Sequence, residues 1–442
     1  MPIGISAIAV GRGALDELPG LADIPASGSA VVMTDAVPKS RGGEDVLEEV
    51  EARLERSLLR RVVVGQAAER VHADELTIAQ CIEQVSGASL LVTVGSGTLA
   101  DIGKAVSARL GGVRHVVVQT ATSVNGFADD QSVLLIDGVK RTTPTRWPDA
   151  LIADSLILTG APVGLNLAGV GDLLAMFTAP ADWRLASLLL MVDEYLPATV
   201  GLVRKHGDRL LSLAPRLASR DEEAATGVAE ILALSGISMG VAGTTAPASG
   251  MEHTVSHLIE MTMNSRGADS AYHGAQVGVC TIVASVLWSR IVAQLRAAQP
   301  PDLRFPTEDE MEGRVMAAFA PLDSAGAMGR ECWRLYAKKL RRWNANRAAL
   351  LEVDWSAFEA SLTDLLGRPA ELAASLVAAG APTRFSQLDP PVDEELVRWA
   401  LEQCHLMRDR FTIADLAFLT GGWDADAVDE VLDAATAAGG GP

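Results

Sequence analysis

The first 160 residues alternate short, continuous apolar runs with longer amphipathic patterns. Apolar runs that do not alternate with polar residues indicate strands whose two faces are both covered by helices, as in a parallel α/β sheet. We predict strands at residues 30–35, 61–65, 90–94, 115–120, 133–138 and 150–153, helices at 46–59, 73–85 and 99–110, and an irregular loop at 142–148. The resulting prediction is an α/β domain over residues 1–160.

From about residue 160 onwards, helical patterns replace the apolar runs. We predict helices at 165–178, 181–195, 197–213, 222–239, 251–263 and 275–297, with more towards the end of the chain. Thr307 and Thr412, each followed by an acidic residue three positions later, are typical of capped helix starts. We therefore predict an all-α domain over residues 161–442, with a boundary at about 155–165 and a fraying tail at 437–442.

Composition excludes several classes of protein. A chain of 442 residues with 49% hydrophobic content can bury two cores, and its formal charge of −19 argues against nucleic acid or anionic membrane as a partner. The four cysteines lie far apart, residues 1–20 lack the pattern of a leader, and the longest apolar runs fall short of the roughly 18 residues of a membrane span. We expect a cytoplasmic protein, and the apolar helical half suits a homodimer or a larger homo-oligomer.

Histidines are concentrated in one stretch. Three of the seven lie at positions 253, 257 and 273. His253 and His257 are four residues apart, so on a helix they share a face, and a polar break precedes His273. Imidazoles brought together in this way suit a divalent metal with an open coordination position. Ordinary helix-face and capping histidines give the same spacing, so spacing alone leaves both interpretations open.

A small-residue turn, Gly95-Ser96-Gly97-Thr98, lies between a predicted strand and a predicted helix. Its backbone N–H groups and the helix N-terminus favour an anion such as a dinucleotide pyrophosphate. The turn matches neither GxGxxG nor the Walker A pattern, and a tight strand–helix connection looks the same. Asp35, at the end of another predicted strand, is placed to accept a hydrogen bond from an adenosine ribose, although a turn aspartate would occupy the same position.

Asp172 stands at the start of a predicted helix, where a carboxylate also stabilises the helix dipole. With two histidines it would make a shell of two nitrogens and one oxygen that suits Zn²⁺, Ni²⁺ or Fe²⁺. A metal held in this way lowers the pKa of an alcohol, so that hydride can leave its carbon for a nicotinamide.

Taken together, the motifs resemble the sn-glycerol-1-phosphate dehydrogenase branch of the superfamily that contains iron-containing alcohol dehydrogenases and dehydroquinate synthase. The matching segments are residues 94–98 with Asp101 and Lys104, 137–140, 169–174 leading to 181–184, 249–253 with 256–257, 273–274 with 277–278, and 407–412. They follow the family's order over nearly the whole chain. The fold class implied is a dehydroquinate synthase-like α/β dinucleotide-binding domain followed by an all-α domain.

The resemblance assigns roles to individual residues. It implies one divalent metal (Zn, Ni or Fe) held by Asp172, His253 and His273, with His257 and Asn125 as catalytic residues beside the substrate. It implies an NAD or NADP site made by Asp35, Gly95, Ser96, Gly97, Thr98, Asp101, Thr120, Ser123 and Ser132, where Asp35 favours NAD. The implied reaction interconverts a small keto and polyol phosphate pair, such as dihydroxyacetone phosphate and sn-glycerol 1-phosphate, or a related polyol.

Two departures from the family pattern concern the substrate. Asn125 stands before Gly126 where the family has an aspartate, and Ala175-Met176 stands where relatives have Gly-Lys. The first alters a contact to a substrate hydroxyl, and the second removes a cation that would anchor an acidic substrate. The remaining candidates for a phosphate partner are Lys140, Arg141, Arg146, Arg184 and Arg266, each of which also fits a solvated surface position.

Two other functions compete with a dehydrogenase. One is a dehydroquinate synthase-like cyclase or lyase, in which NAD is reduced transiently and then regenerated. The sparse histidines of this chain argue against its dense set of basic residues. The other is a coenzyme-binding sensor or scaffold without activity, which only Asn125 and Met176 support.

Overall fold

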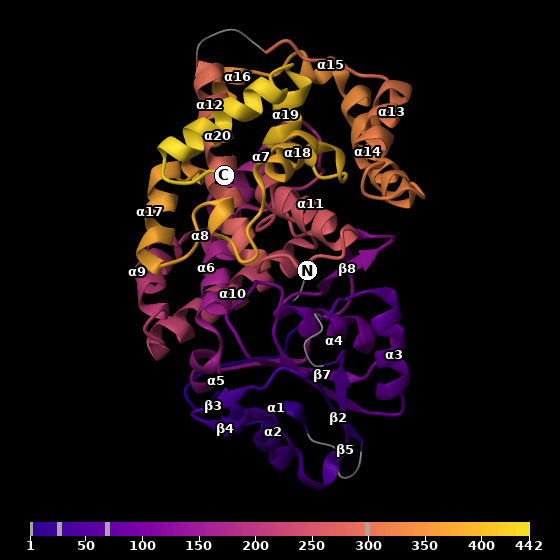
Figure 1. Ribbon diagram of the computed structural model, residues 1–442, viewed down its shortest axis with the longest axis vertical. Helices are drawn as coiled ribbons and strands as arrows, with labels where there is room; N and C mark the ends of the chain where they lie inside the picture. The colour runs from indigo at the N-terminus through magenta and orange to yellow at the C-terminus, as the bar shows by residue number, and fades with distance from the viewer. Residues whose placement is uncertain (1–2, 24–28, 67–70, 297–300) are drawn as a thin grey trace. The chain divides into compact units, whose positions relative to one another are not determined.

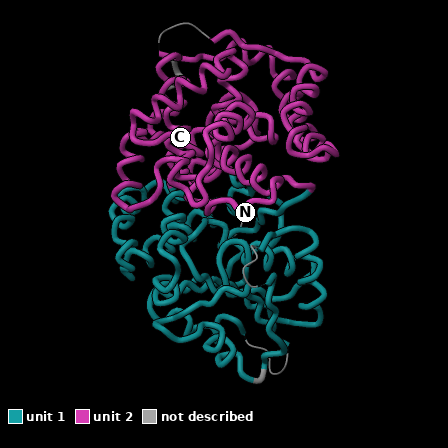
Figure 2. The backbone as a smooth tube through the Cα atoms, viewed as in Figure 1, with its two compact units in different colours: residues 1–136, 140–173, 201–245 teal, residues 137–139, 174–200, 246–442 magenta. Residues whose placement is uncertain are grey.

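The computed structural model describes residues 3–23, 29–66, 71–296 and 301–442. The chain forms two compact units, shown in different colours in Figure 2. Unit 1 comprises residues 1–136, 140–173 and 201–245, and unit 2 comprises residues 137–139, 174–200 and 246–442. This division does not coincide with the single boundary predicted near residue 160. The chain returns to unit 1 after residue 200 because helix α10 (Glu222–Ala242) packs against strand β1 (Ala7–Gly11).

Unit 1 is built on a six-stranded parallel sheet (Figure 1). In spatial order its strands are β1, β10 (Ala150–Asp154), β7 (Arg114–Gln119), β6 (Leu90–Gly95), β2 (Ala30–Asp35) and β5 (Leu58–Val64). The chain passes from β2 outwards to β5 and then returns to the other side of β2 as β6. The strand order therefore reverses between β2 and β6, and in open parallel sheets ligands bind outside the carboxyl ends of strands at such a switch point.

Helices cover both faces of this sheet. Val32 belongs to an apolar cluster that includes residues of α1 (Leu18–Ala22) and α2 (Val46–Leu54). Its neighbour Val31 belongs to a second cluster, with residues of α3 (Glu75–Val85) and α4 (Gly97–Arg109). Successive residues of one strand are thus buried on opposite faces, which confirms the parallel α/β fold predicted from the continuous apolar runs.

Several predicted elements have different limits. The predicted helix at 46–59 ends at Leu54, a 3-10 turn follows at Glu55–Ser57, and β5 begins at Leu58. Most residues of this edge strand are exposed, so its start looks like the polar face of a helix. The predicted loop at 142–148 begins with strand β9 (Val139–Pro144), which pairs with β8 (Gln131–Ile136) in a separate two-stranded sheet. Strand β1 was not predicted.

Further elements of the first 245 residues are short strands and helices. They are β3 (Ser40–Arg41), β4 (Glu44–Asp45), α5 (Ser155–Gly160), α6 (Val163–Leu174), a 3-10 turn at Ala175–Phe177, α7 (Ala179–Leu188), α8 (Pro197–Arg204) and α9 (Gly207–Leu217). The predicted helix at 197–213 is divided between α8 and α9, because the chain turns at Lys205 and His206 before α9 begins at a glycine.

Unit 2 is helical in its described part, as predicted (Figure 1). Its helices enclose one large apolar cluster. Besides α7, its helices are α11 (Met251–Ser265), α12 (His273–Arg296), α13 (Glu308–Phe319), α14 (Ala327–Ala345), α15 (Arg347–Leu350), α16 (Trp355–Ala360), α17 (Pro369–Ala379), α18 (Glu394–Gln403), α19 (Ile413–Leu419) and α20 (Ala425–Ala437). Residue 297, the last of the predicted helix at 275–297, lies outside the described residues. Helix α12 contributes the fully buried Trp288 to the cluster and packs along α11.

Local signals at helix ends have mixed outcomes. The Thr412 and Asp415 side chains form a capping box at the start of α19, and the Thr307 hydroxyl accepts the N–H of Glu310. The tail does not fray as predicted, because the Gly440 N–H donates to Ala435 O and the Phe385 N–H donates to Gly441 O.

Three helical segments are long and apolar enough to cross a membrane by length and composition alone: Val163–Leu188, Glu222–Ala242 and His273–Arg296. The prediction of no membrane span counted uninterrupted apolar runs and missed them. Between 72% and 83% of each apolar window is buried inside the protein. Burial within the fold accounts for their apolar character.

Candidate functional site

In unit 1, the carboxyl ends of β2, β6 and β7 form what we call the strand edge. Thr34 lies opposite Val94, so Asp35 and Gly95 end neighbouring strands at the same level. The Thr120 N–H donates to Gly95 O at 3.0 Å, which joins the end of β6 to the residue after β7. The sheet thus brings together three of the residues assigned to the coenzyme.

Helix α4 begins at this edge. Ser96 precedes it in an extended conformation, without a side-chain hydrogen bond to the helix. A Cβ at Gly97 would lie 2.4 Å from the Val124 Cγ2 atom, so a larger residue would displace the neighbouring loop. Residue 97 therefore has no side chain at the point where the first turn of α4 begins. The N–H groups of that turn are the donors that an anionic group requires.

Asp35 is engaged within its own loop. Its Oδ1 atom accepts a hydrogen bond from the Val37 N–H at 2.8 Å. The same atom forms an ion pair with the Lys39 Nζ atom at 2.5 Å. The Lys39 ammonium also donates to Val37 O at 2.8 Å. The carboxylate predicted to meet a ribose therefore has a cation bound directly to it.

Beneath the strand edge lies a buried lysine. Lys104 on α4 forms ion pairs with Asp129 at 2.5 Å and Asp101 at 3.2 Å, and donates to Gly126 O at 2.7 Å. Burial alone would lower the pKa of Lys104, but the charges of Asp129 and Asp101 outweigh it and the pKa is raised. The ammonium therefore holds residues 126–131 against α4.

Asp101 and Ser132, two predicted coenzyme residues, make their contacts within this framework. The Asp101 carboxylate accepts the Val133 N–H at 3.2 Å in addition to the Lys104 ion pair. The Ser132 hydroxyl donates to Asp101 O at 3.1 Å and lies 3.2 Å from the Thr145 hydroxyl. Both side chains link α4 to β8, so their structural role is clear and a coenzyme contact stays a prediction.

The loop after β7 contains two polar side-chain atoms without a partner. Ser123 Oγ and Asn125 Nδ2 are buried and form no hydrogen bond among the described residues. Buried polar groups are normally satisfied, so unpaired ones are places where a ligand can supply the missing partner. The same loop holds Asp172, because the Asn125 N–H donates to its Oδ2 atom at 2.8 Å.

A glycine allows α6 to approach this loop. A Cβ at Gly169 would lie 1.8 Å from Thr122 O, a backbone atom that cannot rotate away. The Asn166 side chain strengthens the contact, since its Oδ1 accepts the Thr122 N–H at 2.9 Å. Asp172, near the C-terminal end of α6 rather than at a helix start as predicted, is positioned by this packing.

In unit 2, three histidine rings gather where α11 and α12 run together. The ring centroids of His253 and His257 are 6.2 Å apart, and each lies 5.2 Å from the ring of His273. His253 and His257 are buried, and His273, the first residue of α12, is partly exposed. We call these three residues the histidine cluster.

Carboxylates lie behind two of these rings. The Glu252 Oε1 atom is 3.0 Å from His253 Nδ1, and the Glu260 Oε1 atom is 3.3 Å from His273 Nδ1. A carboxylate that accepts from Nδ1–H fixes the tautomer of a histidine and makes Nε2 the nitrogen that can bind a metal. The side chain of Glu252 also accepts hydrogen bonds from the Thr178 hydroxyl and the Gly250 N–H.

The third ring faces a cation instead. An Arg408 guanidinium nitrogen lies 2.7 Å from His257 Nδ1, and both side chains are buried. Because arginine only donates, His257 Nδ1 must accept, and its proton is carried on Nε2. His257 therefore accepts a hydrogen bond at Nδ1, whereas Nδ1 of His253 and of His273 faces a carboxylate.

A buried aspartate fixes the start of α11. The Asp182 Oδ2 atom accepts the Met251 N–H at 2.7 Å, and its Oδ1 atom accepts the Ile413 N–H at 2.9 Å. Burial and the nearby Glu252 charge raise the pKa of Asp182, while these two N–H groups oppose the rise. The hydrogen bonds tie α7 to the N-termini of α11 and α19, and so position the helix that carries His253 and His257.

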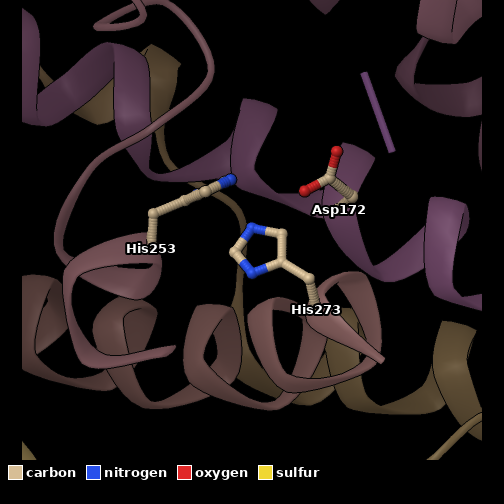
Figure 3. Close-up of side chains that lie close together, drawn as sticks. All are labelled: Asp172, His253 and His273. Atoms are coloured by element: carbon tan, nitrogen blue, oxygen red, sulfur yellow. The ribbon is translucent and has the colours of Figure 1, made fainter. Parts of the chain in front are cut away.

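The side chains of Asp172, His253 and His273 lie close together (Figure 3). Each offers one ligand atom, and these atoms lie within 4.8 Å of one another. A second group of three, His257, Glu260 and His273, meets the same distance limit. Its Glu260 already faces His273 Nδ1, and its His257 faces the Arg408 cation, which opposes a bound metal ion. The first group, with two nitrogens and one oxygen, fits a divalent ion better.

Comparison with known proteins adds independent information. Residues 9–162 match the family described as iron-containing alcohol dehydrogenase. The glycerol-1-phosphate dehydrogenase [NAD(P)+] of Bacillus licheniformis is 28% identical over 93% of this chain and 88% of its own length. The protein of the same name from Methanosarcina barkeri is 30% identical over 66% of this chain and 81% of its own length. The chain belongs to the glycerol-1-phosphate dehydrogenase family.

Solved structures agree on the fold. Glycerol dehydrogenase from Schizosaccharomyces pombe superposes with a TM-score of 0.61 at 15% identity, over 99% of this chain and 91% of its own. A probable glycerol dehydrogenase from Sinorhizobium meliloti superposes with a TM-score of 0.60 at 18% identity, over 98% and 97% of the two chains. These superpositions confirm the fold class, and the relatives named above confirm the family and the prediction of a dehydrogenase.

This member of the glycerol-1-phosphate dehydrogenase family has functional candidates that sequence reasoning missed. Glu252 and Glu260 contact the Nδ1 atoms of the two histidines that are metal-ligand candidates. Lys39 forms an ion pair with Asp35. One signal was available for the first two. Glu252 directly precedes His253, and Glu260 lies seven residues after it, which places it on the same helix face. For Lys39 no periodic signal exists, since its contact is made within an irregular loop.

The candidate phosphate partners have varied surroundings. Arg146 pairs with Asp149 at 3.1 Å, Arg184 lies 5.1 Å from the centre of the Tyr195 ring, and Arg266 is exposed at 3.9 Å from Asp393. Arg141 is buried and Lys140 is partly buried. Met176 is buried.

Proposed function

We propose that this protein is an NAD(P)- and metal-dependent dehydrogenase that interconverts dihydroxyacetone phosphate and sn-glycerol 1-phosphate, or a closely related small polyol pair. The observation that carries the proposal is the group of Asp172, His253 and His273, whose ligand atoms lie within 4.8 Å of one another in a chain of this family. The relatives are named for glycerol 1-phosphate and NAD(P)+, which supports the substrate and the coenzyme.

Asp172, His253 and His273 would hold one divalent ion, for which zinc, nickel and iron are candidates. When bound there, such an ion polarises the substrate oxygen and stabilises the negative charge that develops on it. Glu252 and Glu260 keep the two histidine rings turned with Nε2 away from the carboxylates.

His257 would donate a hydrogen bond from Nε2–H to the substrate oxygen and so orient it, while water would carry the proton of the hydroxyl. Its Nδ1 atom accepts from Arg408 and cannot take up a second proton while that hydrogen bond holds. The side chain of Asn125 would meet the substrate through Nδ2, a buried donor without a partner among the described residues. An amide donor here suits a carbonyl or phosphoryl oxygen of the substrate.

The coenzyme would lie along the strand edge. Gly95, Ser96, Gly97 and Thr98 would meet the pyrophosphate with backbone N–H groups and the N-terminus of α4. Asp35 would meet the adenosine ribose, and Thr120 and Ser123 would face the nicotinamide end. The unpaired, buried Ser123 hydroxyl supports its share of this assignment.

A screen of substrates tests the proposal directly. The purified protein is loaded separately with Zn²⁺, Ni²⁺ and Fe²⁺, bound metal is measured by elemental analysis, and NADH and NADPH oxidation is followed by absorbance. We expect about one ion per chain and the fastest oxidation with dihydroxyacetone phosphate. Dihydroxyacetone serves as the matched substrate without phosphate, and equal rates with both would move the substrate to an unphosphorylated polyol.

Absence of turnover with every triose and polyol carbonyl would contradict the dehydrogenase proposal. The Bacillus and Methanosarcina relatives are both named as dehydrogenases, and neither favours the cyclase alternative. A cytoplasmic location and a homo-oligomeric state stay predictions, which fractionation of cells and sedimentation of the purified protein would test.

A further inference from the structure

The corner of the strand edge at Asp35 combines a carboxylate and a cation in one place. Asp35 ends β2 on one side of the switch point, where acidic residues accept the ribose 2′-hydroxyl of NAD in open α/β sheets. Lys39 returns to the same point, with its Nζ atom 2.5 Å from Asp35 Oδ1. The two charges together determine what the corner can bind.

Lys39 is held at this position rather than extended into solvent. Its side chain is only 8% exposed, and Nζ donates to Val37 O at 2.8 Å as well as to Asp35. The Lys39 carbonyl accepts the Val46 N–H at 3.1 Å, which anchors the backbone to the start of α2. A lysine side chain normally keeps its ammonium in water, so its confinement beside a ligand-binding strand end requires these specific partners.

Arg41, the neighbouring cation, forms its ion pairs with other carboxylates. Arg41 pairs with the buried Asp154 at 3.0 Å and with Glu49 at 2.9 Å. With Asp16 at 3.5 Å as a third partner, its guanidinium is held by three carboxylates, whereas the Lys39 ammonium has one carboxylate and one carbonyl. An additional anion near Asp35 would be met by Lys39.

We propose that Lys39 makes the corner accept NADPH as well as NADH, an inference that rests on the proposed function. With NADH, Asp35 accepts the ribose 2′-hydroxyl and Lys39 balances its charge. With NADPH, the 2′-phosphate pairs with the Lys39 ammonium, which offsets the repulsion between the phosphate and Asp35. Asp35 alone would favour NADH, and the Asp35–Lys39 pair removes that preference.

The test is the ratio of kcat/KM with NADPH to kcat/KM with NADH, measured on the metal-loaded full chain. We expect the two values to lie within about tenfold of each other in the unmodified protein. Lys39→Met should lower the ratio of the NADPH value to the NADH value roughly tenfold to hundredfold, the size of one hydrogen bond to a charged group. Asp35→Asn should shift the ratio in the opposite direction. Lys338→Met, at an exposed lysine of unit 2, is the control for loss of one charge.

Direct binding of NADH and NADPH, followed by coenzyme fluorescence without substrate, separates the two proposals. If neither nucleotide binds, the proposed coenzyme function fails, and this inference falls with it. If both bind and Lys39→Met leaves their ratio unchanged, the function stands and the role of Lys39 is overturned. Rejection of NADPH by the unmodified protein, by more than about a hundredfold, also overturns it. Lys39→Arg, which keeps the charge, should restore NADPH binding.

Discussion

The strand edge of unit 1 and the histidine cluster of unit 2 are built on opposite principles. The strand edge is made by backbone, by small residues and by hydroxyls at strand ends, and the parallel sheet brings them to one level. The histidine cluster is made by long side chains, and each ring has a charged neighbour: Glu252, Glu260 or Arg408. A backbone site depends on the packing beneath it, whereas a side-chain site depends on single residues and their immediate neighbours.

The comparison predicts its largest effect at a metal-ligand candidate. His253→Ala should reduce bound metal from about one ion per chain to a trace and lower kcat/KM roughly a thousandfold, because the charge of the ion contributes several kcal/mol to the transition state. NADH binding should change by less than about twofold, since the strand edge does not use this side chain. Elemental analysis and coenzyme fluorescence on one preparation measure both quantities.

His405→Ala is the control for removing a histidine from unit 2, because His405 is buried, stacks on Phe418 and is not one of the candidate ligands. It should lower stability and leave the metal content of the folded protein unchanged. A His253→Ala protein that keeps its full complement of metal would contradict the proposed coordination.

The second largest effect should come from beneath the strand edge. Lys104→Met removes the cation from Asp129 and Asp101, and leaving the buried Asp129 carboxylate without its cation costs about 3–5 kcal/mol in the free energy of unfolding. Unfolding in urea measures this loss. Lys205→Met, at an exposed lysine of the same unit, should change stability by less than about 0.5 kcal/mol.

Adding Asp129→Asn to Lys104→Met should recover part of the loss, because it removes one of the unpaired charges. A Lys104→Met protein less than about 1 kcal/mol below the unmodified one would mean that the strand edge does not depend on this ammonium.

These two regions also differ in how far the sequence predicts them. Continuous apolar runs predict the parallel sheet, because successive residues such as Val31 and Val32 are buried on opposite faces of the sheet. A parallel sheet also places the carboxyl ends of neighbouring strands together. The positions of Asp35 and Gly95 at one edge follow from that topology. The start of the edge strand β5 and the return of helix α10 to unit 1 escape prediction, since exposure hides the first and no local pattern shows the second.

In the histidine cluster, spacing predicts that His253 and His257 share a face of α11, but it leaves open which rings face carboxylates and which faces a cation. Arg408 lies 151 residues from His257 along the chain, so their contact has no local signature. Family resemblance supplied the ligand set, and the tertiary structure supplied its partners. Asp172 illustrates the limit: its residue type was informative, yet its place near the end of α6 was predicted as a helix start.

A smaller effect is expected one layer behind the ligands. Glu252→Gln keeps the shape of the side chain but weakens its hydrogen bond to His253, and loss of such a partner typically lowers metal affinity tenfold to hundredfold. Glu260→Gln should act in the same direction with a smaller change, because its separation from His273 Nδ1 is 3.3 Å rather than 3.0 Å. Competition with a chelator measures both affinities.

Excess metal should restore the activity of Glu252→Gln, which a misfolded cluster could not show. Metal affinities equal to that of the unmodified protein would mean that the carboxylates do not orient the rings.

The smallest effect concerns a histidine inside the sheet of unit 1, away from either candidate site. His115 is buried with its Nε2 atom 3.0 Å from the Thr93 hydroxyl, and burial, with the charges of Lys104 and Arg146, lowers its pKa to about 3. An unfolded histidine has a pKa near 6.5, so between these values the unfolded state binds a proton that the folded state does not. Stability must therefore fall as the pH falls through this window, by about 1 kcal/mol between pH 7 and pH 5.5.

His115→Gln cannot titrate, so its deficit in stability relative to the unmodified protein should shrink by that amount over the same range, measured by urea unfolding at both pH values. Parallel stability curves would show that this ring is protonated in the folded sheet. In that case the buried framework under the strand edge would tolerate charge better than its packing indicates.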